Sequence, residues 1–122
     1  QDEAAVLRAV DLTVDWLFEG QWKNVILEIN NECDVQYDHP ILQTGRVPEL
    51  IQRVHSKRRD GRRFLVSTSF SGGKLPTSEV VQSSDFVLLH GNGIADPKEA
   101  AALVRKVRAL KEFKKKPIVF AH

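Results

Sequence analysis

The chain has 122 residues, of which 42% are hydrophobic and 28% charged, so it is long enough for one globular domain with its own core. Its 18 basic and 16 acidic residues leave a formal charge of +2, which is too near balance to predict a nucleic-acid-binding protein. The single cysteine, Cys33, excludes an internal disulfide and a cysteine-based metal site. The sequence contains no apolar run of about 18 residues, so no membrane span is predicted.

The first half of the chain alternates between helical and strand patterns. Apolar side chains at helical spacing predict a helix over residues 2–19, with Gly20 as its C-cap. A short apolar strand is expected at residues 25–29, followed by a polar loop. A second helix is expected to begin at Pro48 and to stop at Asp60-Gly61.

The second half continues the alternation. A strand is expected at residues 63–69, followed by the glycine-rich turn "FSGGKLP" and one or two helical turns at residues 77–84. A third strand is expected at residues 85–91. The last strand is expected at residues 117–121.

The helix before the last strand carries a clear start signal. Asp96 is the expected N-cap, Pro97 occupies the first helical position, and Glu99 follows the cap by three residues, which is the spacing of a capping box.

Short apolar strands joined through helices predict an α/β fold with a parallel sheet covered by helices. We expect residues 1–122 to form a single α/β domain, either a partial (half) (β/α)8 barrel or a small open doubly wound sheet. No glycine-rich dinucleotide or phosphate loop follows a strand, so no cofactor is expected.

Polar side chains end three successive strands. The first strand leads into Asn31 and Glu32, the second ends in Ser69, and the third ends in His90 and Asn92. In parallel α/β folds the carboxyl ends of the strands share one edge of the sheet, here called the rim, where ligands bind. The sequence therefore predicts a site on the rim.

Four segments resemble consecutive strands of the retaining (β/α)8-barrel glycoside hydrolases of the cellulase-like clan. "VILEINNE" resembles their fourth strand, "RRFLVSTSF" the fifth, "DFVLLHGN" the sixth and "KKPIVFAH" the seventh. The resemblance implies a carbohydrate ligand, with Glu32 as the catalytic general acid/base. The substrate-binding residues expected with it are Asn31, Tyr37, His39, Ser69, His90 and Asn92.

The second carboxylate of such a site does not appear where the resemblance would place it. Retaining hydrolysis uses two carboxyl groups about 5 Å apart, and the family's seventh strand usually ends in the nucleophile Glu, whereas this sequence reads Phe120-Ala121-His122. Glu28 is expected to point away from the rim, into the packing of its strand. We therefore expect either a segment of a larger barrel enzyme or a half-barrel homologue that is inactive as an isolated chain.

A half-barrel would leave two unpaired strand edges and an exposed inner face. The side chains expected on that face are Val25, Leu27, Val66 and Leu88. Pairing of two copies would cover it, so a homo-oligomer, most simply a two-fold dimer, is expected.

Three other interpretations remain open. The chain could be a non-catalytic oligomeric α/β domain that binds a small polar ligand on the rim. It could be a metal-dependent hydrolase that uses Glu32, Asp34, His39 and His90, although no closely spaced histidine pair supports this. Finally, Cys33 and His39 could form a nucleophile pair.

Overall fold

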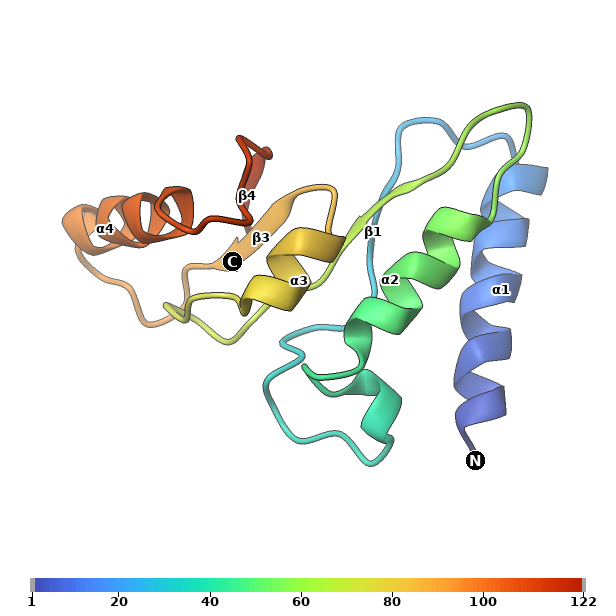
Figure 1. Ribbon diagram of the computed structural model, residues 1–122, viewed down its shortest axis with the longest axis horizontal. Helices are drawn as coiled ribbons and strands as arrows, with labels where there is room; N and C mark the ends of the chain where they lie inside the picture. Colours follow the sequence, from blue (N-terminus) through green and yellow to red (C-terminus); the bar gives the residue numbers. More distant parts are fainter. Residues whose placement is uncertain (1, 122) are drawn as a thin grey trace.

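The computed structural model describes residues 2–121 and confirms an α/β chain in which helices and short strands alternate (Figure 1). Helix α1 lies at one end of the molecule and α4 at the other, and β4 returns from α4 to lie beside β3. They are α1 (Glu3–Glu19), β1 (Ile26–Glu28), the 3-10 helix η1 (Pro40–Leu42), α2 (Val47–Ser56), β2 (Leu65–Ser67), α3 (Ser78–Ser83), β3 (Val87–His90), α4 (Pro97–Arg108) and β4 (Ile118–Ala121).

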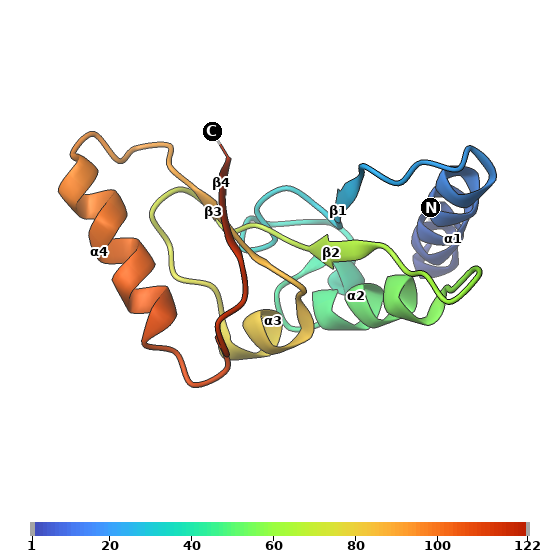
Figure 2. The same ribbon diagram turned by 90° about the horizontal axis from the view of Figure 1, so that it is seen from above.

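The strands form two parallel pairs, β1 with β2 and β3 with β4 (Figure 2). The amide of Asp85 donates to the carbonyl of Val66 at 3.0 Å, and the hydroxyl of Ser67 donates to the carbonyl of Phe86 at 2.7 Å. These two contacts, here called the seam, join β2 to the start of β3. Val66 contacts Asp85 and the next residue, Ser67, contacts Phe86, so the two segments run in the same direction, as parallel neighbours do.

Helices α1 and α2 cover one face of the β1–β2 pair. Leu27, Ile29 and Val66 pack on that face in a core with Val14 of α1 and Val54 of α2. On the opposite face, here called the open face, Ile26 is 52% and Leu65 50% exposed.

The expectation that Val25, Leu27, Val66 and Leu88 are exposed on an inner face is therefore wrong. The first three pack in the helix-covered core, and Leu88 is only 6% exposed. Side chains alternate along a strand, so the neighbours of these residues take the opposite face. Apolarity alone did not distinguish the two faces, because Ile26 and Leu65 are equally apolar.

The predicted start of α4 is confirmed, whereas the predicted end of α2 is not. Asp96 caps α4 as predicted, because its carboxylate accepts the amide of Lys98 at 2.8 Å and Pro97 is the first helical residue. Helix α2 ends at Ser56, earlier than predicted. The segment after it turns back on itself through the antiparallel bridge between Arg59 and Arg62, with Asp60-Gly61 in left-handed conformations (φ 52° and 75°).

A partly buried carboxylate, that of Asp85, holds the seam together. Its side chain is 13% exposed and accepts two hydrogen bonds from the Arg63 guanidinium at 2.8 and 2.9 Å. It also lies 2.7 Å from His55 Nε2 and accepts the amide of Val66 at 2.9 Å. Burial alone would raise the pKa of Asp85, but these donors outweigh it and hold the pKa at about 2.

Lys116 ties the segment before β4 to α3. Its ammonium donates to the carbonyls of Val81, Gln82 and Ser84. These carbonyls lie at the C-terminal end of α3, where backbone acceptors lack helical partners and a cation is favourable. Burial lowers the pKa of Lys116.

We expect Asp85→Asn to lower the free energy of unfolding by about 3 kcal/mol at pH 7, because it leaves the partly buried Arg63 guanidinium without its anion. Since the folded-state pKa of Asp85 lies below its unfolded value, its ionisation contributes about 2 kcal/mol above pH 4, and this is lost as the pH falls from about 4 to about 2. Urea unfolding at a series of pH values measures both effects.

The matched control is Asp60→Asn, which changes an exposed carboxylate in the turn after α2. It should shift stability by less than about 0.5 kcal/mol. Equal losses in the two variants, or a difference between wild type and Asp85→Asn that does not shrink toward pH 2, would contradict the assigned role.

Candidate functional site at the strand ends

The structure brings together three of the residues expected on the rim. Glu32 Oε1 lies 3.0 Å from His90 Nδ1 and 3.4 Å from Asn92 Nδ2. The Glu32 side chain is 18% exposed and that of His90 only 1%. The loop after β1 and the end of β3 thus form a half-buried carboxylate held by an imidazole and an amide.

Ser69 positions Glu32 from beneath. It is fully buried, and its hydroxyl oxygen accepts the Glu32 amide at 2.8 Å while donating to Glu28 Oε1 at 2.5 Å. Glu32 has a left-handed backbone (φ 52°), which is unfavourable for a residue with a side chain and needs support from its surroundings. The Ser69 hydroxyl supplies part of that support.

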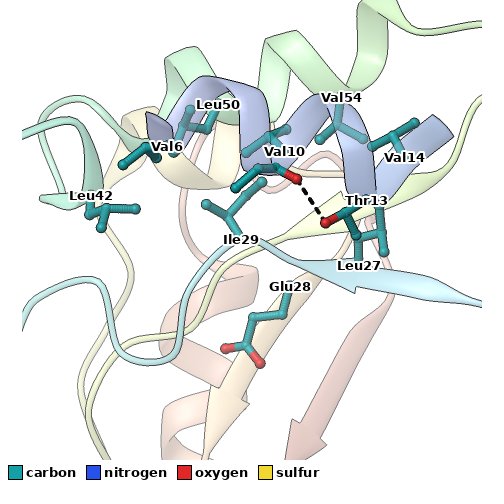
Figure 3. Close-up of a pocket in the computed structure, with 11 residues that line it drawn as sticks. Val6, Val10, Thr13, Val14, Leu27, Glu28, Ile29, Leu42, Leu50 and Val54 are labelled. Atoms are coloured by element: carbon teal, nitrogen blue, oxygen red, sulfur yellow. Dashed lines mark hydrogen bonds between the residues drawn. The ribbon is translucent and has the colours of Figure 1, made fainter. Parts of the chain in front are cut away.

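Glu28 is a candidate functional residue that the sequence reasoning missed, since it does not point into the packing of its strand. It lies exposed on the open face, and Figure 3 shows its carboxylate extending away from α1 while Leu27 and Ile29 point toward the helices. The alternation of side chains along β1 could have placed it there, on the same face as Ile26. The open face therefore carries a carboxylate hydrogen-bonded to the serine that holds Glu32.

The other expected substrate contacts surround this centre less directly. Asn31 is exposed, and its carbonyl accepts the Tyr37 hydroxyl. His39 precedes η1, and its carbonyl accepts the amide of Leu42 at 2.9 Å. Among the described residues, no hydrogen bond joins Tyr37 or His39 to the Glu32 carboxylate.

Asp34 fastens the loop after β1 to the loop after β2. Its carboxylate accepts the Ser71 amide at 2.7 Å, the Ser71 hydroxyl at 2.5 Å and the Lys74 ammonium at 2.9 Å. Burial acts to raise the pKa of Asp34, but these donors keep it below its usual range. Asp34 therefore serves as an ionised anchor beside Glu32.

Gly72 lets the loop after β2 close against the loop after β3. A Cβ at Gly72 would lie 2.0 Å from the Asn92 carbonyl oxygen, so only glycine permits this approach. The amide of the next residue, Gly73, donates to the His90 carbonyl at 3.1 Å. The glycine-rich turn after β2 thus packs against the partners of Glu32.

The thiol and metal hypotheses gain no geometric support. Cys33 is fully buried, and burial raises its pKa, which disfavours the nucleophilic thiolate. Within residues 2–121, no group of three or more His, Cys, Asp or Glu side chains is placed to hold a metal ion. Glu32 and His90 do meet, but Asp34 is engaged by Ser71 and Lys74.

Comparisons with protein-family models, with curated proteins and with solved structures gave no match. No helix within residues 2–121 combines the length and apolarity needed to cross a membrane. A functional proposal therefore rests on the geometry of the rim.

We expect Ser69→Ala to lower the free energy of unfolding by about 2 kcal/mol, because the Glu32 amide loses its acceptor in a partly buried position. Amide hydrogen exchange at Glu32 should accelerate as well, since the left-handed backbone loses its support. Exchange measured by NMR reports both changes.

The control is Ser83→Ala, which removes a hydroxyl that donates to the Glu79 carbonyl on the surface of α3. This change should leave exchange at Glu32 unaltered. If Ser69→Ala also leaves it unaltered, Ser69 does not position Glu32.

Proposed function

We propose that the rim binds a carbohydrate, with Glu32 as the general acid/base group of a partial, glycoside hydrolase-like (β/α)8 fold. The observation that carries the proposal is the Glu32 carboxylate, which is half-buried between His90 Nδ1 and Asn92 Nδ2. A carboxyl group held in this way accepts a hydrogen bond from a sugar hydroxyl or, when protonated, donates to a glycosidic oxygen.

The layout of the strands supports the partial-barrel part of the proposal. Both strand pairs are parallel, and the polar groups of the site follow the carboxyl ends of β1, β2 and β3. Within residues 2–121, helices cover only one face of the β1–β2 pair, as they do in a barrel, whereas a doubly wound sheet has helices on both faces.

The positions of the two carboxylates favour binding without turnover by the isolated chain. Glycoside hydrolysis needs two carboxyl groups that flank the scissile bond. Glu28 and Glu32 come from the same strand and its loop and share one serine, so they lie on one side of a bound sugar. In this proposal Glu28 orders the site through Ser69, and a nucleophile from the opposite side would be needed for retaining hydrolysis.

A non-catalytic α/β domain that binds another small polar ligand is the second candidate. The position of Glu28 and Glu32 on one side of the rim favours this candidate, because recognition of a ligand does not need the two flanking carboxyl groups that hydrolysis needs. The two candidates differ in which ligand occupies the rim.

The test is an NMR titration of the chain with soluble oligosaccharides of different linkages. We expect millimolar binding by at least one of them, with amide shifts confined to Glu32, Ser69, His90, Asn92 and their neighbours. Glu32→Gln should weaken this binding about tenfold, because a charged acceptor is replaced by a neutral amide. Hydrolysis of aryl glycosides should be undetectable.

Glu79→Gln provides the control, since it makes the same change at an exposed position of α3. It should bind as the wild type does. The carbohydrate proposal fails if no oligosaccharide shifts the rim amides, and shifts produced there by other small polar solutes would favour the second candidate.

A further inference from the structure

We propose that two copies of this chain pair through their open sheet edges, so that β4 of each copy docks on the edge of β1 beneath α1 of the other. This pairing goes beyond the proposed function and does not rest on it. It commits the surface to a second copy of the chain, arranged about a two-fold axis.

Both outer strands have a free edge. Within residues 2–121, β1 pairs with β2 alone and β4 with β3 alone. Exposed strand edges present unpaired amides and carbonyls that readily accept another strand. Since each strand is already parallel to its neighbour, β4 of one copy can extend the β1 edge of the other in the same parallel sense.

An apolar groove lies beside the edge of β1. It is a cavity of about 340 Å³ between α1, α2 and β1, shown in Figure 3. The side chains that matter for docking line it from α1 and β1; they are Val6, Ala9, Val10, Thr13, Leu27 and Ile29. A strand added to β1 would pass beneath α1 and direct alternate side chains into this groove.

Phe120 of β4 is an apolar side chain on the corresponding side of its sheet. It pairs in register with Leu89, as Ile118 does with Val87, and directly paired residues share a face. The other three of these residues pack in the core beneath α4, but Phe120 remains 43% exposed. In the proposed pair its ring enters the groove beneath α1 of the other copy.

The helices that would become neighbours carry opposite charge. Helix α1 with its cap, residues 2–19, holds five acidic residues and one basic residue. Helix α4 holds four basic residues and one acidic residue, and more lysines follow it. Three of the acids on or beside α1 already pair with bases at α2; these pairs are Glu3–Arg46, Asp11–Arg53 and Asp15–Lys57. The charges left on α1 and its cap are Asp2, Glu19 and Arg8, a net charge of −1, which is opposite in sign to that of α4.

Light scattering coupled to size-exclusion chromatography tests the pairing. Wild type at high micromolar concentration should have twice the 13.8 kDa mass of one chain. Ala9→Arg places a cation in the groove at an exposed position, and Phe120→Asp removes the ring. Each variant alone should run as a 13.8 kDa monomer with an unchanged far-UV circular dichroism spectrum.

Mixing the two variants provides the sharper test. A mixed pair has one contact between the native groove and native Phe120, and a second contact in which the introduced arginine of one variant meets the introduced aspartate of the other. The mixture should therefore regain the dimer mass, which an interface elsewhere on the chain would not produce. Leu75→Asp, at a side chain of similar exposure (40%), is the control and should remain dimeric.

Three results would overturn the proposal. One is a monomeric wild type at this concentration. Another is that Ala9→Arg and Phe120→Asp, each measured alone, are folded and remain dimeric. The third is a mixture of the monomeric variants that stays monomeric, because the reciprocal contact predicts recovery.

Discussion

The carboxylate of Asp85 is the interaction on which the arrangement of the two strand pairs depends. The pairs meet at the seam, where few backbone hydrogen bonds join β2 to β3. Asp85 compensates by binding Arg63, His55 and the amide of Val66 at once, so that α2, β2 and the start of β3 share one partly buried anion. Such a charge is tolerated inside a protein only when it is fully paired, which makes the geometry of the seam specific.

The candidate site depends on this geometry, because its residues come from both sides of the seam, at the carboxyl ends of the strands. The Glu32 amide is held by Ser69, which follows β2, whereas its carboxylate is held by His90, which ends β3. A shift between the two strand pairs would separate these partners. Gly72 reinforces the closure on the rim side by allowing the two loops to touch. The seam is therefore anchored by charge at one end and by close backbone packing at the other.

Local signals predicted the order of elements and the cap at Asp96, because periodicity and capping are properties of short segments. The placement of Glu32 and His90 on one rim followed from the general rule that the carboxyl ends of parallel strands share an edge. What the sequence did not reveal depends on contacts between distant segments. Asp85 has the pattern of an ordinary polar residue until Arg63 and His55 are brought to it, 22 and 30 residues away. The two faces of β1 could not be assigned without knowing which one the helices cover.

That assignment also shows that the two ends of the open face differ in polarity. On β1 and β2 the amino ends are apolar, with Ile26 opposite Leu65, whereas the carboxyl ends are polar, with Glu28 bound to Ser69. A polar ligand is therefore favoured at the rim, and apolar surface is left for burial at the other end. The proposed pairing of two copies uses the strand edges and the groove on the helix side of β1, so the rim stays open. Ligand binding at the rim and self-association through the strand edges therefore use different surfaces of the chain and need not compete.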